Sequence, residues 1–252
     1  MEPVRSHRSK LVVDAARLHR GRIRRQRNQT LIEGPHLVEE AVKAGVTFSE
    51  VFVHHDDAEG ADLARRWSLE PLWVDDAALR RLAATESPRG PVAVIQIPQP
   101  RLEANRDLLV SWGVSDPGNA GSLIRIAWAF GWGYAYTQSS ADPWSPKAVR
   151  AGAGGQFHVP LARIEGLGEL RAWTTVATAV KGGEELARPG AGPVAVLVGE
   201  EAAGLPEEVV AAADVLVTIP MPGNAESLNA AVAAGIVVHR LAKGGEVGEG
   251  GV

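Results

Sequence analysis

Three short segments of this 252-residue chain place polar and charged side chains directly after apolar runs. They are residues 116–121, which precede Arg125, residues 197–206, and residues 219–229. Their amide, hydroxyl, carboxylate and guanidinium groups are the kinds that orient a nucleophile and assist the removal of its proton. Because the carboxyl ends of parallel strands meet at one edge of a sheet, we expect the three segments to form one ligand site.

Each segment also has an ordinary structural interpretation. Asn119 would cap a helix on which Arg125 is a surface charge, and Ser227 would cap another helix. Gly199 belongs either to a simple strand-to-helix loop or to a loop that lets a ligand approach the backbone. Two prolines and a glycine in the third segment favour a rigid, preorganised loop.

The composition excludes several classes of chemistry. Cysteine is absent, which excludes disulfides, cysteine-based metal sites and thiolate nucleophiles. The seven histidines show neither H-E-x-x-H nor H-x-H spacing, so we expect no metal. The chain also lacks a G-x-G-x-x-G dinucleotide loop between strand and helix, a P-loop and a G-x-S-x-G elbow.

The net charge of −4 conceals a strong asymmetry along the chain. Residues 1–30 carry nine basic and two acidic side chains, a charge of +7, so the other residues carry −11. A basic segment of this kind favours contact with a polyanion such as RNA, although a solvated basic tail has the same composition.

The first part of the chain, residues 1–98, alternates between strand and helix patterns. This pattern predicts a small α/β domain. The expected helices cover residues 9–19, 35–45, 61–67 and 75–86, and the expected strands cover 30–34, 49–55 and 91–97.

A polar, proline-containing linker at residues 99–107 leads into a second α/β domain at residues 108–243. Near-continuous apolar strands separated by helices predict a mostly parallel sheet covered on both faces. A glycine-rich flexible tail follows at 244–252. The expected strands cover 108–114, 133–137, 174–180, 193–199 and 214–220, and the expected helices cover 119–131, 145–154 and 227–242.

The chain contains no apolar run long enough to span a bilayer and no signal-peptide pattern at its beginning. We therefore expect a cytoplasmic protein without a membrane partner.

Taken together, the motifs resemble those of the SpoU (TrmH-type) family of RNA ribose 2′-O-methyltransferases, within the SPOUT superfamily. The resemblance rests on Asn-x-Gly-x-x-x-Arg, Gly-x-Glu-x-x-Gly-Leu and Ile-Pro-Met-x-Gly-x-x-x-Ser-Leu-Asn, which occur in that order behind strands. Residues 145–151 match a further stretch of the family. Residues 31–34 and 37–41 resemble the ribosomal-protein-like substrate-binding domain that often precedes the methyltransferase domain.

The resemblance implies a deep trefoil knot in the second domain, a homodimer formed through that domain, and S-adenosylmethionine as cofactor. It also implies a bent cofactor among the backbone groups of the second and third motifs. The implied cofactor-binding residues are Thr178, Ala179, Gly199, Glu201, Ile219, Met221 and Leu228.

The resemblance further implies methyl transfer to a ribose 2′-hydroxyl by in-line attack, without a metal. Arg125 would act at this hydroxyl as base or phosphate clamp, and its permanent charge favours the electrostatic role. Asn119 would position Arg125 or the ribose, while Ser227 and Asn229 would bond the nucleotide and the neighbouring loop. Glu201 would order the loop or the RNA rather than transfer a proton. The implied RNA-binding residues are Arg20, Arg22, Arg24, Arg25, Arg27 and Arg150.

Three positions depart from the family pattern. Ala230 and Ala231 replace a frequent Val-Ser pair, and Gly152 replaces a frequent serine. None of them coincides with a proposed catalytic position. Only an RNA or packing contact at Gly152 is therefore in question.

The sequence leaves the substrate open. The fused first domain favours ribosomal RNA of the large subunit over transfer RNA. Two other classes remain: a non-catalytic RNA-binding ribosome-assembly protein on the same fold, and an enzyme for a small anionic substrate. The four polar residues Asn119, Arg125, Ser227 and Asn229 argue against the first, and the basic N-terminal segment argues against the second.

Overall fold

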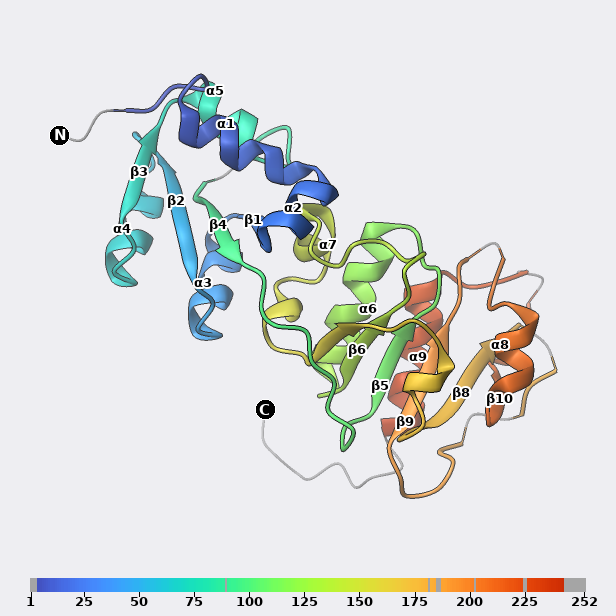
Figure 1. Ribbon diagram of the computed structural model, residues 1–252. Coiled ribbons are helices and arrows are strands. Elements are labelled where there is room, and N and C mark those ends of the chain that lie inside the picture. The colour runs from blue at the N-terminus through green and yellow to red at the C-terminus, as the bar shows by residue number, and fades with distance from the viewer. Residues whose placement is uncertain are drawn as a thin grey trace. The chain divides into compact units, whose positions relative to one another are not determined.

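The computed structural model describes residues 4–88, 90–180, 182–184, 187–201, 203–223 and 226–242 (Figure 1). The predicted tail at 244–252 lies outside the described residues. The chain divides into two compact units. Unit 1 contains Met1–Gln99 and Asp142–His158, and unit 2 contains Pro100–Ala141 and Val159–Val252. Among the described residues, no helix is long and apolar enough to cross a membrane.

Unit 1 is built on a four-stranded mixed sheet. Its strand order is β1-β4-β2-β3, in which β4 runs antiparallel to both neighbours and β2 runs parallel to β3. The core lies between this sheet and the helices, with Leu18, Phe52 and Val92 fully buried. The strands are β1 (Gln29–Glu33), β2 (Phe48–His54), β3 (Pro71–Val74) and β4 (Val92–Gln96), and the helices are α1 (Lys10–Ala16), α2 (Gly21–Arg27), α3 (Pro35–Lys43), α4 (Ala58–Arg66), α5 (Asp76–Leu82) and α7 (Pro146–Ala151).

Helix boundaries in unit 1 follow local chemistry. Pro35 occupies the first turn of α3, and Gly45 follows its end with φ of +69°, as predicted. The side chains of Asp57 and Asp75 accept backbone N–H groups at the starts of α4 and α5. Ser9 takes the cap position of α1, but its side chain makes no capping hydrogen bond.

The sequence did not predict α2 or β3. The arginine-rich α2 offers little apolar periodicity, since Ile23 is its one large apolar residue. The four residues of β3 are too few to show a clear alternation.

One segment from the second half of the sequence folds into unit 1. Asp142–His158, which contains α7, packs against β1, where the Thr30 hydroxyl donates to the carbonyl of Trp144 at 2.6 Å. The predicted domain at 108–243 is contiguous, whereas unit 2 omits these residues. Buried aromatic and polar side chains of the segment, including Trp144 and Gln156, find their packing partners in unit 1.

Unit 2 is a six-stranded, fully parallel sheet, where the apolar strand patterns predicted five strands in a mostly parallel sheet; the three-residue β7 and the helix α8 were not predicted. Its order is β10-β8-β9-β5-β6-β7, and every residue of β5 and β9 is buried. Helices α6 and α9 pack together and contact the central strands β5 and β9. The strands are β5 (Leu108–Ser111), β6 (Gly133–Tyr136), β7 (Leu161–Arg163), β8 (Thr174–Ala179), β9 (Val194–Val198) and β10 (Val215–Thr218), and the helices are α6 (Pro117–Ala129), α8 (Glu207–Ala212) and α9 (Ala230–Ala242).

The parallel sheet brings the three polar motifs to one edge. They follow β5, β9 and β10, whose carboxyl ends all point the same way because the strands are parallel. The α/β architecture with a mostly parallel sheet is thereby confirmed. The trefoil knot stays a prediction.

Candidate active site

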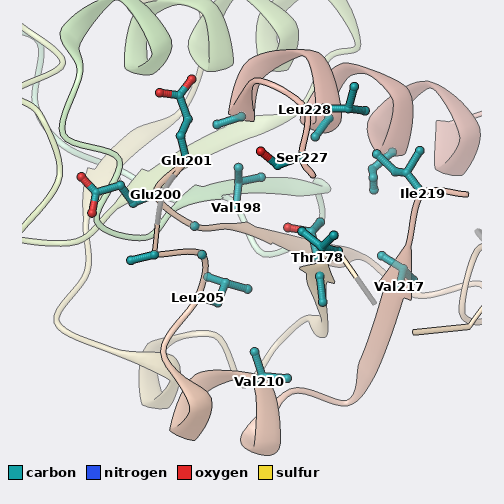
Figure 2. Close-up of a pocket in the computed structure, with 18 of the residues that line it drawn as sticks. Thr178, Val198, Glu200, Glu201, Leu205, Val210, Val217, Ile219, Ser227 and Leu228 are labelled. Carbon is teal, nitrogen blue, oxygen red and sulfur yellow. The ribbon is translucent and has the colours of Figure 1, made fainter. Parts of the chain in front are cut away.

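A pocket of about 650 Å³ opens at the carboxyl ends of β8, β9 and β10 (Figure 2). In Figure 2, Ser227 and Leu228 lie on one side of it, while Leu205 and Val210 lie on the opposite side. All of the predicted cofactor-binding residues line the pocket, namely Thr178, Ala179, Gly199, Glu201, Ile219, Met221 and Leu228.

The pocket combines apolar walls with negative charge. The described residues that line it include three glutamates, Glu200, Glu201 and Glu226, and neither lysine nor arginine. This charge suits a cationic ligand and opposes a phosphate-bearing one. The Thr178 hydroxyl donates to the carbonyl of Leu197 at 2.9 Å, so its hydrogen is used within the fold.

Gly199 is required by the shape of the loop itself. A Cβ at this position would lie 2.2 Å from the carbonyl carbon of Gly204, so no side chain fits. The Gly204 N–H donates to the carbonyl of Glu200 at 2.8 Å and closes the turn. The fold itself therefore requires glycine here, and because Gly199 also lines the pocket, the approach of a ligand to its backbone stays a prediction.

Three residues from three motifs meet in one hydrogen-bonded cluster. The Asn119 amide donates to Oε1 of Glu201 at 2.9 Å, and the Asn229 amide donates to Oδ1 of Asn119 at 3.0 Å. Asn229 also donates to Glu201. The Glu201 carboxylate thus holds the loops after β5, β9 and β10 together, and the cluster links these loops through charge-assisted hydrogen bonds.

Local capping leaves the two asparagines available for this cluster. Asp116, rather than Asn119, caps α6, because its Oδ1 accepts the Asn119 N–H at 2.9 Å. Oδ1 of Asn229 accepts the N–H groups of Ala231 and Val232 at the start of α9, at 3.0 and 3.3 Å. Helix α9 therefore begins three residues after Ser227, and Asn229 caps it.

A second hydrogen bond joins the first and second motif loops. The Ser115 hydroxyl donates to Oε1 of Glu200 at 2.8 Å. Ser115 and Glu200 were not among the predicted site residues. The consecutive acids Glu200 and Glu201 were the available signal, since Glu200 binds Ser115 in the loop that follows β5 and Glu201 binds Asn119 in the first turn of α6.

Arg125 and Ser227 are exposed at this site. Arg125 lies on α6, six residues beyond Asn119, and has no hydrogen-bond or ion-pair partner among the residues that the structure describes. Ser227 lines the pocket. Both side chains are therefore free to meet a substrate.

The structure corrects the role of one predicted RNA-binding residue. Arg24 is 4% exposed, and its guanidinium binds Asp142 together with the carbonyls of Leu18 and His19. A side chain whose donors are all used inside the fold is not available to a phosphate.

The other predicted RNA-binding residues remain at the surface of unit 1. Arg27 pairs with Asp14, its Nη2 lying 4.0 Å from the carboxylate. Arg150, on α7, belongs to the same unit as the arginines of α2. The exposed members of the set are Arg20, Arg22, Arg25, Arg27 and Arg150.

One group of potential metal ligands occurs among the described residues. His54, His55 and Asp56 lie together after β2 in unit 1, whereas the pocket is lined by residues of unit 2. Nε2 of His54 lies 3.1 Å from Asp76, and Nδ1 of His55 lies 3.2 Å from the carbonyl of Val74.

Comparisons with known proteins agree with this geometry. Residues 107–239 match the SpoU rRNA Methylase family, and residues 10–93 match the MRM3-like substrate binding domain. The chain is 33% identical over 248 residues to the 23S rRNA (guanosine(2553)-2′-O)-methyltransferase RlmP of Bacillus subtilis (strain 168), covering 96% of this chain and 99% of that protein. It is 33% identical over 181 residues to the 23S rRNA (uridine(2479)-2′-O)-methyltransferase of Streptomyces viridochromogenes, covering 63% and 61% of the two chains.

The solved structures give the same assignment. The SpoU methyltransferase AviRb from Streptomyces viridochromogenes, in complex with AdoMet (S-adenosylmethionine), aligns with a TM-score of 0.83 and 26% identity, covering 94% of this chain and 98% of that one. The family match covers the whole parallel sheet and all three motif loops. This chain is therefore a member of the SpoU rRNA methylase family.

Proposed function

We propose that this protein transfers a methyl group from S-adenosylmethionine to a ribose 2′-hydroxyl of ribosomal RNA. The observation that carries the proposal is the pairing of an acidic pocket, whose described lining residues include neither lysine nor arginine, with a rim of polar residues from three motifs. The pocket provides for a cationic methyl donor, and the rim provides hydrogen-bonding groups for a nucleotide. Membership of the family and the activities of the two 23S rRNA methyltransferases that resemble this chain support the same reaction.

The residues of the pocket fit S-adenosylmethionine. Three glutamates complement its positive charge, and Val198, Leu205 and Leu228 supply apolar surface for an uncharged ring. Because Gly199 has no side chain, the backbone of Gly204 can approach it closely in the loop after β9. When bound, the cofactor supplies an electrophilic methyl group.

The chain's own residues position the ribose and stabilise its oxygen. Arg125 carries a permanent positive charge on the exposed face of α6, where it would hold the neighbouring phosphate and stabilise negative charge on the ribose oxygen while the hydroxyl proton passes to water. Asn119 and Ser227 bond the ribose and its nucleotide. Glu201 accepts two amide groups and so keeps the loops in place, which is a positioning role.

Phosphate contacts come from the exposed arginines of unit 1. Arg20, Arg22, Arg25 and Arg150 are exposed in the unit that matches a substrate-binding domain. Their charges bind the RNA backbone with a salt-dependent affinity. The two relatives modify different nucleotides of 23S rRNA, a guanosine and a uridine. For this chain the proposal therefore names the class of RNA and not the nucleotide. A cytoplasmic location agrees with this substrate.

Mass spectrometry of ribose methylation in cells with and without the gene tests the proposal. We expect one 2′-O-methyl group to disappear from large-subunit ribosomal RNA and to return when the purified protein and S-adenosylmethionine are added. Loss from transfer RNA instead would establish the transfer-RNA alternative. Unchanged methylation of all RNA, together with no calorimetric binding of S-adenosylmethionine, would favour the non-catalytic RNA-binding protein.

We further propose that unit 2 forms a homodimer through α6 and α9. Val232 and Ile236 on α9 are 53% and 40% exposed, and Phe130 at the end of α6 is 37% exposed. The two helices pack together, and Phe130 contacts His239 edge to face at 6.0 Å between ring centroids. Exposed apolar side chains on adjacent helices favour burial against a second copy.

Light scattering during size-exclusion chromatography tests the dimer. The wild type should elute with twice the mass of one chain, and Ile236→Asp should shift the population toward the monomer. A monomeric wild type at micromolar concentration would contradict this part of the proposal.

A further inference from the structure

Two histidines and an aspartate gather at the end of β2 in unit 1. His54 is the last residue of the strand, and His55 and Asp56 lie in the turn that follows it. This turn brings the two imidazole rings to 4.3 Å between their centroids, and one potential ligand atom from each of the three side chains lies within 4.8 Å of the other two. Adjacent histidines fit neither H-E-x-x-H nor H-x-H, which explains why the sequence pattern did not indicate a metal.

The ring of His55 is oriented so that one nitrogen keeps a free lone pair. Its Nδ1 lies 3.2 Å from the carbonyl oxygen of Val74, which can only accept a hydrogen bond, so the ring proton belongs on Nδ1. Nε2 then faces Oδ2 of Asp56 at 3.4 Å. A lone pair next to a carboxylate is unfavourable unless a cation or a proton lies between them. Two ligands of one tetrahedral zinc ion are also about 3.4 Å apart, since the bonds to the metal are about 2.0–2.1 Å long.

The ring of His54 has a comparable arrangement with its nitrogens exchanged. Nδ1 accepts the N–H of Asp56 at 3.2 Å, so its lone pair is directed toward the turn. Nε2, which then carries the proton, is buried and lies 3.1 Å from Oδ1 of Asp76, although the two groups are not aligned for a hydrogen bond. Metal-binding histidines generally direct their second nitrogen at a carboxylate or a backbone carbonyl, which fixes the ring. Both rings have such an oxygen beside them, from Asp76 and from Val74.

The charge and exposure of the cluster suit a cation. Asp56 and Asp76 together carry two negative charges, which match the charge of a divalent ion. The side chain of Asp56 is 79% exposed and that of His55 is 42% exposed, so both can turn toward an incoming ion. The ion would replace the long hydrogen bond from the Asp56 N–H to His54, and this N–H would then bond to water.

We propose that Nδ1 of His54, Nε2 of His55 and the carboxylate of Asp56 bind a divalent transition-metal ion such as Zn²⁺, with water at the remaining position. Imidazole nitrogens select such ions, whereas Mg²⁺ and Ca²⁺ take oxygen ligands. The bound ion ties the end of β2 to its neighbours, because Val74 is the last residue of β3 and Asp76 is the first of α5. The site lies entirely in unit 1 and is independent of the proposed methyl transfer.

Calorimetric titration of zinc chloride into the full chain tests the site. The protein carries no histidine tag and is freed of metal with a chelator before the titration. We expect one zinc ion per chain with a dissociation constant in the micromolar range, and no binding of magnesium chloride. His55→Gln should weaken zinc binding by roughly tenfold or more. The matched control, His36→Gln, removes an exposed imidazole elsewhere in the same unit and should bind zinc as the wild type does.

A second variant and a second measurement make the test independent of His55. Asp56→Asn removes the carboxylate charge without a change of size, and its control is Asp62→Asn on α4. Zinc should raise the midpoint of thermal unfolding of the wild type and of the control, because an ion that binds only the folded state stabilises it by mass action. The same zinc concentration should leave the midpoints of Asp56→Asn and His55→Gln unchanged. Circular dichroism without zinc should show the wild-type fold for both, since both side chains are exposed.

Three results would overturn the inference. The first is a wild type that binds no zinc. The second is equal zinc affinity in His55→Gln and His36→Gln, which would place the ion elsewhere, for example among the glutamates of the pocket in unit 2. The third is magnesium binding as tight as zinc binding, which would show that carboxylates alone hold the ion. None of these results bears on methyl transfer, so the proposed function stands or falls separately.

Discussion

The two units present opposite charges to their expected ligands. The pocket of unit 2 is lined by three glutamates and, among the described residues, by neither lysine nor arginine. Unit 1 exposes Arg20, Arg22 and Arg25 on and beside one short helix. The difference agrees with the proposed function, in which a cationic methyl donor and a polyanionic substrate bind at separate surfaces.

Arginine itself illustrates this division. Arg24 is buried and makes four hydrogen bonds, whereas Arg125 is exposed and has no hydrogen-bond or ion-pair partner within the described ranges. A guanidinium whose donors are occupied stabilises a local geometry. One whose donors are free can bind a substrate, and Arg125 is the free cation closest in sequence to Asn119.

The largest expected effect concerns this free cation. Arg125→Ala should reduce the methylation rate by about a thousandfold, because it removes the positive charge next to the reacting oxygen. Single-turnover assays with ribosomal RNA would measure the rate, and calorimetry should show unchanged affinity for S-adenosylmethionine. Methylation at the wild-type rate would remove Arg125 from the mechanism.

The next effect concerns the carboxylate that joins the three loops. Glu201→Ala should lower kcat/KM by roughly ten- to a hundredfold, since two amide groups lose a charged hydrogen-bond acceptor. Glu208→Ala on the exposed side of α8 is the matched control and should behave as the wild type. Equal activity in the two variants would show that the cluster does not order the site.

A smaller effect is expected at the RNA-binding surface. Arg22→Ala should weaken RNA binding by several-fold and reduce the slope of its salt dependence by about one contact, as the loss of one phosphate ligand requires. Fluorescence anisotropy over a series of salt concentrations would measure both quantities. The control is Arg65→Ala on α4, whose guanidinium pairs with Asp62. If the salt dependence of RNA binding had the same slope in both variants, α2 would not contact the RNA phosphates.

The smallest effect concerns stability at low pH. A hydrogen bond from Lys43 holds the pKa of Glu40 below its ordinary value of 4.5, against the effect of burial, and the contact with His158 lowers it further. A carboxyl whose pKa is lowered on folding stabilises the protein above its ordinary pKa, and this contribution disappears as the pH falls through the lowered value. The free energy of unfolding should therefore decrease on acidification below pH 4.5.

Denaturant titrations at several pH values would measure this dependence. In Glu40→Gln the decrease should be smaller, and the variant should be less stable than the wild type near neutral pH. Glu70→Gln in an exposed loop is the control. A pH dependence of Glu40→Gln identical to that of the wild type would contradict the assignment to Glu40.

Much of the fold could be predicted because the apolar pattern is strong. The runs at 108–114 and 193–199 predicted strands, and the structure places β5 and β9 there with every residue buried. The helix at 21–27 was not predicted, because its sequence, GRIRRQR, shows no apolar face. Its one buried side chain is Arg24, whose guanidinium bonds to the carbonyl of Leu18 and to Asp142.

The motif residues were predicted more accurately than their roles. For Asn119 the sequence left a helix cap and a site residue as alternatives; Asp116 takes the cap position, and the Asn119 amide binds Glu201. Gly199 lines the pocket, and its missing side chain also admits the close approach of Gly204. Both findings concern contacts between residues that sequence spacing alone does not pair.

The sequence by itself determined the parallel sheet, the family and the residues of the pocket, because apolar periodicity and motif order are local properties of the chain. Only the tertiary structure decided which polar side chains bind each other and which remain free. Arg24 and Arg25 are adjacent and chemically identical, but Arg24 meets Asp142 across 118 positions and is buried, while Arg25 is exposed. The physical reason is that burial and hydrogen-bond satisfaction depend on distant parts of the chain, which come together only on folding.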